Sequence, residues 1–96
     1  MIYRRTPQFH KDLECLPEAI RAKVPKAFRL FQQDPRHPSL QVKKIQRRKT
    51  TRDGKEIWEG RIDQNYRFTF HYDGDVVWFR RLGPHAIIDE EARGSA

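Results

Sequence analysis

The feature that most constrains this chain is an unbroken alternation from Tyr66 to Tyr72. Aromatic side chains occupy every second position, at Tyr66, Phe68, Phe70 and Tyr72, with Arg67, Thr69 and His71 between them. A period of two residues is the pattern of a β-strand that is buried on one side. The aromatic side must therefore face the core, and the chain must build a sheet around this strand.

The next residues predict a hairpin. Asp73-Gly74 is a strong signal for a two-residue type I′ turn, which would pair Tyr72 with Asp75. This register places Phe70 opposite Val77 and Phe68 opposite Phe79 on the core side. On the other side it pairs Arg67 with Arg80, Thr69 with Trp78 and His71 with Val76, since directly opposed residues share a face. The sequence thus predicts an open sheet face that carries two arginines and a tryptophan.

Residues 57–63 predict the strand before this hairpin. Trp58, Gly60 and Ile62 share the core parity, whereas Glu59, Arg61 and Asp63 share the other. A two-residue loop at Gln64-Asn65 would put Arg61 on the core side, so a three-residue loop or a bulge is expected instead. Arg61 then lies on the open face near Arg67. Gly60 at a core position indicates a bulge or a close approach of backbone.

The first half of the chain predicts a strand and two helices. Residues 1–6 could form an edge strand of the sheet. Thr6-Pro7 begins a helix, because threonine caps helix starts and proline suits the first turn. Leu16-Pro17 begins a second helix, which should end near Gln33 or Asp34 because Pro35 excludes continuation. Pro25 inside it predicts a kink or a break, and its buried stripe is Ile20, Val24, Ala27, Phe28 and Phe31.

The remaining segments are shorter. Residues 40–47 follow a turn-rich link and alternate imperfectly, as a strand with a bulge does. The loop 47–55, RRKTTRDGK, has no apolar residue and is either a solvated loop or a flap that contacts phosphates. Residues 85–93 predict a short terminal helix, and 94–96 a disordered tail. The fold class is α+β: an N-terminal strand and a two-helix hairpin on a twisted antiparallel sheet, in a single domain of residues 1–93.

Composition limits what the chain does. Its 96 residues suffice for one core, and 20 Lys and Arg against 13 Asp and Glu give a net charge of +7. This charge favours a polyanionic partner, nucleic acid first, and a merely soluble basic surface is the alternative. The lone Cys15 excludes an internal disulfide and suits a reducing cytosol. No apolar run is long enough for a membrane span, so a cytoplasmic location is expected.

The side chains suited to chemistry are cations, imidazoles and a tryptophan. The four histidines show no metal-ligand spacing, so we expect a site without metal or cofactor. RNA cleavage suits such a site, because the 2′-hydroxyl supplies the nucleophile and the protein adds proton transfer and charge stabilisation. Arginines grip phosphate, Trp78 could stack a base, and His85 could titrate near neutral pH. The alternative is structural: the arginines would pair with Glu59 and Asp63, and the loop would cover Trp78.

In their order and spacing, these motifs resemble the RelE/ParE toxin superfamily of bacterial toxin–antitoxin systems. The resemblance covers nearly the whole chain: a strand, an LP-type helical hairpin, a DPxHPSL link, a basic strand, then WEGRI, NYRFTF and a final GPH. It implies a small α+β fold in which two N-terminal helices pack on an antiparallel sheet. It also implies a co-encoded antitoxin that wraps the toxin and, in the RelE-like branch, cleavage of mRNA in the ribosomal A site.

Matched position by position, the resemblance assigns Arg61, Arg67 and His85 to the site. Two positions depart from the family pattern. Glu59 stands where some RelE-like members have a lysine, and Glu91 stands where many have a tyrosine near the C-terminus. Glu59 could act as the general base of a reorganised site.

The first hypothesis is a ribosome-dependent mRNA endonuclease toxin that inhibits translation. Arg61 and Arg67 would stabilise phosphate charge, with His85 as general acid or base. RNA would be held by residues of the basic strand, the loop and the last strand: Lys43, Lys44, Arg47, Arg48, Lys49, Trp78 and Arg80. The alternatives are a non-enzymatic DNA gyrase inhibitor of the ParE-like branch and an RNA-binding member that has lost catalysis.

The expected partners are a cognate antitoxin, the ribosome and mRNA. The free protein should be a monomer that forms a hetero-oligomer with its antitoxin. The antitoxin should present an acidic or amphipathic segment, because it must mask a basic face and can anchor in an apolar groove between helices and sheet.

Overall fold

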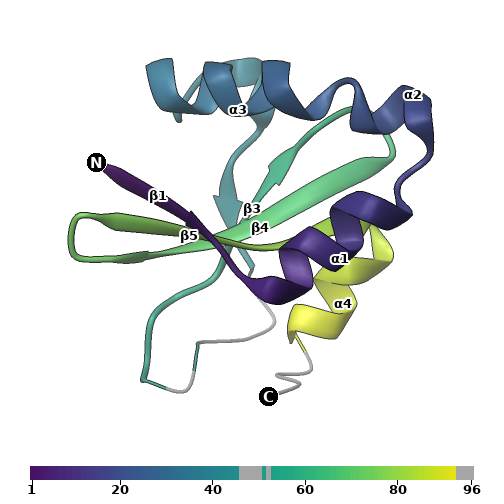
Figure 1. Ribbon diagram of the computed structural model, residues 1–96. Helices are drawn as coiled ribbons and strands as arrows, with labels where there is room; N and C mark the ends of the chain where they lie inside the picture. Colours follow the sequence, from purple (N-terminus) through teal and green to yellow (C-terminus); the bar gives the residue numbers. More distant parts are fainter. Residues whose placement is uncertain (46–50, 52, 93–96) are drawn as a thin grey trace.

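A five-stranded sheet organises the fold of this computed structural model, which describes residues 1–45, 51 and 53–92. Its strand order is β1-β5-β4-β3-β2 (Figure 1). The strands are β1 (Ile2–Arg5), β2 (Lys43–Lys44), β3 (Trp58–Arg61), β4 (Tyr66–Asp73) and β5 (Val76–Pro84). The predicted α+β class is confirmed, and the sheet is mixed because the edge strand β1 runs parallel to β5.

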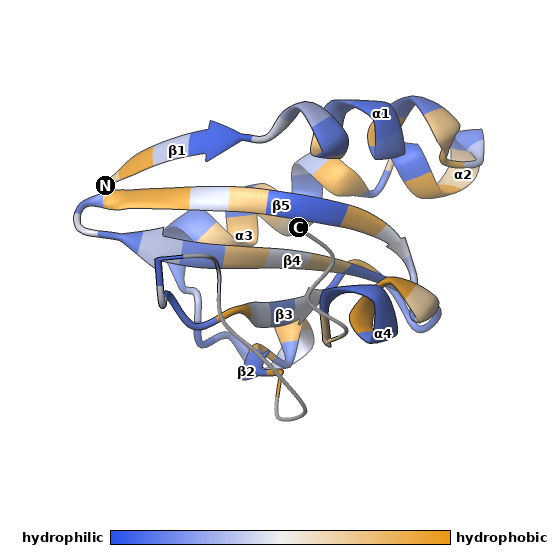
Figure 2. Cartoon of the chain, turned by 90° about the horizontal axis from the view of Figure 1, so that it is seen from below, coloured by the Kyte–Doolittle hydropathy of each residue, from blue (hydrophilic) through white to orange (hydrophobic). Residues whose placement is uncertain are grey.

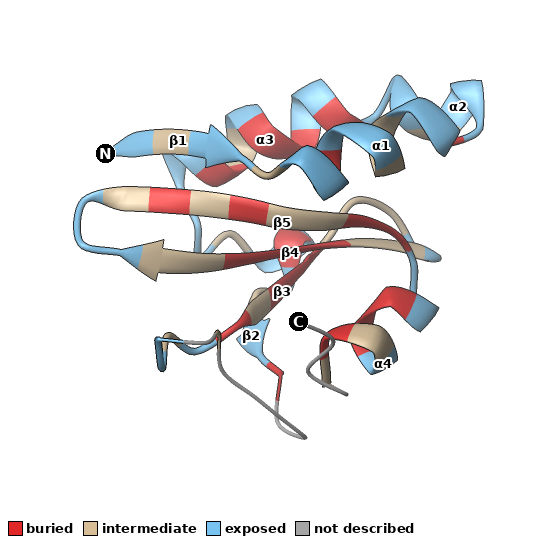
Figure 3. Ribbon diagram, turned by 60° about the horizontal axis from the view of Figure 1, so that its bottom comes forward, coloured by how far each residue is buried: buried red, intermediate tan, exposed pale blue. Residues whose placement is uncertain are grey.

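Helices cover both sides of the sheet. They are α1 (Pro7–Cys15), α2 (Glu18–Arg21), α3 (Val24–Gln33) and α4 (Ala86–Ala92), with a 3₁₀ turn, η1 (Pro38–Leu40), after α3. The first three helices lie on one side of the sheet and α4 lies on the other (Figure 3). In the described part of the chain, no helix combines the length and apolar character that crossing a membrane requires.

The helix boundaries follow the capping and proline signals of the sequence. The Thr6 hydroxyl oxygen accepts the Phe9 N–H at 3.1 Å and caps α1, as predicted. The same hydroxyl donates to the Arg80 carbonyl at 2.8 Å, which ties the start of the helix to β5. Pro25 lies in the first turn of α3, and the second predicted helix is broken there into α2 and α3.

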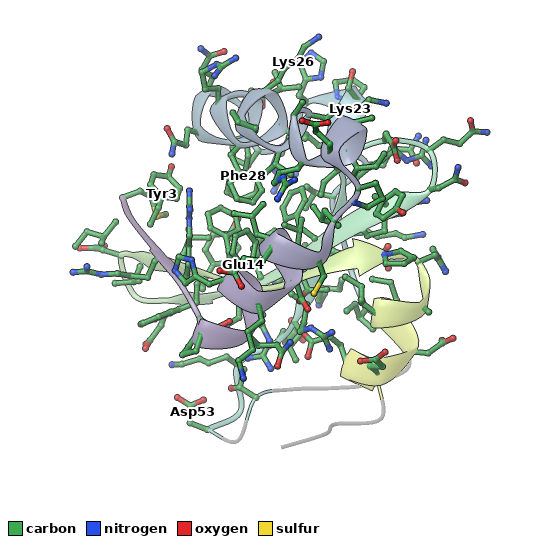
Figure 4. The ribbon with its side chains drawn as sticks, turned by 45° about the vertical axis from the view of Figure 1, so that its right-hand side comes forward. Tyr3, Glu14, Lys23, Lys26, Phe28 and Asp53 are labelled. Atoms are coloured by element: carbon green, nitrogen blue, oxygen red, sulfur yellow. The ribbon has the colours of Figure 1, made fainter. Side chains whose placement is uncertain are left out.

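The core lies between the first three helices and the aromatic side of the sheet, as the alternation predicted. Phe68 and Phe70 are fully buried, and Phe79 is 2% exposed. Phe28 of α3 stacks on Phe79 with ring centroids 4.4 Å apart. Figure 4 shows Phe28 between the helices and the sheet. Phe31 meets Phe70 edge-on at 4.9 Å, so α3 is held by aromatic contacts with two strands.

The predicted register of the hairpin was wrong. The turn is Gly74-Asp75, because Asp73 pairs with Val76, and of the two turn residues only Gly74 has a positive φ, 60°. A glycine at the first central position fits a type II′ turn rather than type I′. Tyr72 therefore pairs with Val77 and Phe70 with Phe79, two residues from the prediction. An even displacement keeps every side chain on its predicted side, which is why the predicted core survived the error.

A bulge in β5 displaces the register once more. Between Phe79, which faces Phe70, and Arg81, which faces Thr69, Arg80 has no partner in β4. Arg67 consequently lies opposite Gly83, and the predicted pairing of Arg67 with Arg80 was wrong. Figure 2 shows this hydrophilic interruption in the middle of an otherwise largely apolar strand.

The predicted connection between β3 and β4 is confirmed. Arg61 pairs with Arg67, so the two-residue loop is excluded. Ile62 donates its N–H to the Tyr66 carbonyl at 2.9 Å, which leaves three residues, 63–65, in the loop. Gly60 marks a close approach, as expected: a Cβ there would lie 2.3 Å from Cζ of Phe68.

The face predicted to be open is partly covered by α4. Ile87 and Ile88 of this helix form a second, smaller core with Ile45 and Ile57. Thr69, predicted to be exposed, is fully buried beneath it. The strand predicted at 40–47 is shorter in the structure, where β2 comprises only Lys43–Lys44 and Ile45 bonds to the Ile57 carbonyl.

Adding a methyl group at Gly60 should destabilise the protein. Gly60→Ala forces the new Cβ into the Phe68 ring, and such overpacking costs about 1–3 kcal/mol. Urea unfolding measures the loss. Phe68→Leu opens space at this point, so the double variant should lose less stability than the sum of the two single changes. Strictly additive losses would show that the contact between Gly60 and Phe68 is not the cause.

Candidate functional site

Two arginines meet on the α4 side of the sheet, near the end of β3 and the start of β4. Arg61 and Arg67 are directly opposed in the register and both are half-buried. Nη1 of Arg67 donates to the carbonyls of Asp63, Gln64 and Tyr66 at 2.9, 3.1 and 3.1 Å, which fixes its guanidinium against the loop.

The charges of these two arginines are not neutralised. Within the described residues neither forms an ion pair, so the predicted structural alternative of pairs with Glu59 and Asp63 is not found. Burial and the nearby charge of Arg61 lower the pKa of Arg67. Nε of Arg61 is buried and has no hydrogen-bond partner in the described part of the molecule. A buried donor beside a second positive charge is stabilised by an incoming anion.

Glu59 is close to the arginine pair but is not exposed. It is opposite Thr69 in β4 and Lys43 in β2, and only 7% of its surface is accessible. Its charge opposes the lowering of the Arg67 pKa. Glu59 therefore acts on the pair electrostatically, and its burial keeps the carboxylate from direct contact with a substrate.

His85 lies at the same end of the sheet. It follows the last residue of β5 and is exposed, and its carbonyl accepts the Ile88 N–H at 3.0 Å as α4 begins. Gly83, two residues earlier, is opposite Arg67. No hydrogen bond or ion pair joins His85 to either arginine among the described residues, so its catalytic role stays a prediction.

Trp78 and Arg80 lie away from the arginine pair. Trp78 is opposite His71, four residues along β4 from Arg67, which is about 13 Å at the rise of a strand. The predicted facing of Trp78 and Thr69 was therefore wrong. Trp78 is half-buried. If Arg67 binds the phosphate of a nucleotide, the base of that nucleotide would have to span this distance to stack on Trp78.

Arg80 belongs to a polar network that holds α4 on the sheet. Glu91 of α4 accepts from Nε of Arg80 and from the Thr69 hydroxyl, both at 2.8 Å. Nη1 of Arg80 lies 3.3 Å from Nδ1 of His71. Glu91 is 6% exposed, so this ion pair is shielded from water. The charge of Arg80 is thus already neutralised by Glu91, and its RNA-binding role stays a prediction.

Sequence reasoning missed this network, although a signal was present. Ile87, Ile88 and Glu91 follow the spacing of one helix face, so the carboxylate had to face inward with the two isoleucines. An inward carboxylate requires a buried cation, and the unpaired residue of a bulge supplies one.

The other predicted RNA-binding residues divide into two groups. Lys43 is exposed on β2 and has no ion-pair partner among the described residues, whereas Lys44 pairs with Glu56 at 2.9 Å and lies over the Trp58 ring. Arg47, Arg48 and Lys49 are outside the described residues. No group of three or more His, Cys, Asp or Glu residues that could hold a metal ion is present in the described part of the chain.

The architecture is that of the small RelE-like toxins. A chain of the RelB–RelE antitoxin–toxin complex from Methanococcus jannaschii has 24% sequence identity and a TM-score of 0.66, over 92% of this chain and 96% of that one. A chain of the archaeal RelE–RelB complex from Pyrococcus horikoshii OT3 has 17% sequence identity and a TM-score of 0.64, over 86% of this chain and 92% of that one. YafQ from E. coli strain BL21(DE3) has 13% sequence identity and a TM-score of 0.66, over 90% of this chain and 94% of that one.

Comparisons based on sequence give no match. No protein-family model matches the chain, and no curated protein matches it. The chain therefore resembles these proteins in fold alone. A functional assignment depends on the residues of the arginine pair.

Acidification should destabilise the fold through His71. Burial and the charge of Arg80 lower the pKa of His71 below its ordinary value of 6.5. As the pH falls through 6.5, the unfolded chain binds a proton before the folded one does, so the free energy of unfolding decreases. The decrease stops below the pKa of the folded state. Urea unfolding between about pH 7.5 and about pH 5 measures it.

The matched variants are His71→Gln, which removes the buried imidazole, and His10→Gln, which removes an exposed one on α1. The first should reduce the pH dependence in this window and the second should not. A His71→Gln protein with the full wild-type pH dependence would contradict the assignment.

Proposed function

We propose that this chain is the toxin of a toxin–antitoxin pair and cleaves mRNA on the ribosome. The observation that carries the proposal is the pair of opposed, half-buried guanidinium groups without an ion-pair partner among the described residues. Two fixed cations can stabilise the charge that develops on a phosphate in the transition state. The proposal is supported by the fold, which RelE and YafQ share.

The proposed reaction uses the 2′-hydroxyl of the RNA as nucleophile. Its oxygen attacks the adjacent phosphorus as a base removes its proton. The bond from phosphorus to the 5′-oxygen breaks, and an acid protonates the leaving oxygen, which leaves a 2′,3′-cyclic phosphate. Arg61 and Arg67 would hold the phosphate oxygens. The reaction requires no metal, because charge stabilisation comes from the guanidinium groups.

His85 is the better candidate for proton transfer. It is exposed at the end of the sheet where the arginines lie, whereas Glu59 is buried. An imidazole serves as acid or base near neutral pH. Glu59 then has the role of adjusting the electrostatics of the arginine pair.

Removing either arginine should slow cleavage. Arg67→Ala and Arg61→Ala should each lower the single-turnover rate on programmed ribosomes by about 10² or more, the scale of losing one stabilising donor. Nε of Arg61 has no hydrogen-bond partner among the described residues, so Arg61→Ala removes the positive charge without breaking a hydrogen bond from that atom. Lys11→Ala is the control, because Lys11 is exposed on α1 on the other side of the sheet.

The thermal stability of each variant separates a catalytic from a structural role. An Arg61→Ala protein that is folded and cleaves at the wild-type rate would refute the proposed role of the pair. Mapping of mRNA ends in cells that express the chain addresses the ParE-like alternative: intact mRNA with a DNA-damage response would support gyrase inhibition instead.

An antitoxin is the proposed partner, since RelE and YafQ homologues of this fold were solved in complexes with RelB and DinJ. A groove of about 370 Å³ between α1 and α3 offers an anchor. Leu13, Val24 and Phe28 line it, and Arg5, Arg21 and Arg29 add positive charge. An amphipathic helix with acidic residues beside its apolar face matches this arrangement.

Affinity for such an antitoxin should fall as salt increases, because part of the attraction is between charges. Titration calorimetry at low and high ionic strength measures the slope. Arg21→Gln should reduce both the affinity and the slope, whereas Lys11→Gln, an exposed change on the α1 surface, should leave them unchanged. An affinity that does not respond to salt would exclude the electrostatic part of the proposal.

A further inference from the structure

A second cleft lies between α3 and the end of β3. Its volume is about 330 Å³, near the lower limit of small-ligand pockets. Apolar side chains contribute one part of its wall: Ala27, Leu30, Leu40 and Ile62. Lys23, Lys26, Ser39, Arg61 and Asp63 contribute the polar part. A wall of this kind suits a ligand that has both an apolar plane and an anionic group.

One lysine of the cleft is held in place. Lys23 donates to Oδ2 of Asp63 at 3.2 Å, and Oδ1 of Asp63 accepts the N–H groups of Asn65 and Tyr66 at 2.9 Å. Burial by itself would raise the pKa of Asp63, but these hydrogen bonds have the larger combined effect and lower the pKa. The carboxylate is thus engaged on both oxygens and is not available to repel an anion strongly.

The other two cations remain uncompensated. Lys26 is exposed, and neither it nor Arg61 has an ion-pair partner among the described residues. Figure 4 shows Lys23 and Lys26 close together on the α2–α3 stretch. With three cations and one carboxylate around an apolar wall, the cleft carries net positive charge.

Arg61 belongs to this cleft and to the arginine pair. Because the two sites share this residue, an RNA strand with a phosphate between Arg61 and Arg67 would pass round the edge of the sheet at β3 to bring a neighbouring nucleotide to the cleft. We propose that the cleft binds this nucleotide, with its base against the apolar wall and its phosphate beside Lys26 and Arg61. The inference rests on the proposed function, and it assigns a nucleotide-binding role to α3, which lies on the opposite side of the sheet from α4.

Small probes test the cleft without cleavage. The four nucleoside 5′-monophosphates, ribose 5-phosphate and inorganic phosphate are titrated into the full chain, and amide shifts are followed by NMR. We expect the nucleotides to shift signals at residues 26–30 and 39–40 and to bind more tightly than ribose 5-phosphate, because only they bury a base. Equal affinity for all three kinds of probe would overturn the inference, since the cleft would then be a site for any anion.

Charge reversal tests the cleft in the reaction. Lys26→Glu should weaken the binding of a short single-stranded RNA and reduce the salt slope by about one. Cleavage at low RNA concentration should slow in proportion to the weaker binding, because Lys26 belongs to the proposed nucleotide site. Lys11→Glu makes the same change on the exposed surface of α1 and should have no effect.

The outcomes separate this inference from the proposed function. Cleavage that depends on Arg67, with no nucleotide shifts in the cleft and no effect of Lys26→Glu, would overturn the cleft alone. Cleft signals that respond to the antitoxin and not to nucleotides would make it a protein-binding surface and would also overturn it. Nucleotide binding in the cleft together with full toxicity of Arg61→Ala would leave the cleft assigned and refute the nuclease.

Discussion

The bulge at Arg80 is the constraint on which the rest of the structure depends. One extra residue in β5 lets Phe79 and Leu82 both face the aromatic core although they are three positions apart. The register beyond it brings Arg81 opposite Thr69, where its guanidinium reaches Asp12 of α1 at 2.7 Å and Glu90 of α4 at 2.8 Å. The hydrogen bond that Arg81 donates to Asp12 raises the pKa of Arg81 more than any other influence.

The same bulge therefore joins both sides of the sheet. Asp12 also accepts the Leu82 N–H at 3.0 Å, which satisfies backbone beside the irregularity. Arg80 binds Glu91 and Arg81 binds Glu90, so α4 is attached by two neighbouring ion pairs. Breaking a shielded pair leaves a buried charge, which is more costly than losing an exposed pair. The position of α4 follows from this attachment.

The sequence determined the fold more completely than the site. The alternation in 66–72, the cap at Thr6, the break at Pro25 and the approach at Gly60 were predicted because each rests on local sterics or on a period. The register was not, since Asp73-Gly74 and Gly74-Asp75 are both acceptable turns and the predicted register ignored the interruption of the alternation at Arg80-Arg81. The prediction of an open face was wrong because the terminal helix had not been placed, and it covers part of that face. Arg61 and Arg67 were brought together as predicted because one loop length decides their pairing.

The arginines of this sheet are of two kinds, those whose charge is neutralised and those whose charge is not, and only the second kind supports a functional role. Arg80 and Arg81 are bound by carboxylates, and their charges serve the attachment of α4. Arg61 and Arg67 repel one another, and the carbonyls that hold Arg67 supply dipoles without neutralising its charge. A fold that neutralises one arginine pair could have neutralised the other with a nearby acid, yet Asp63 binds Lys23 and backbone N–H groups instead. Such a local cost is expected where a protein keeps a site ready for an anion.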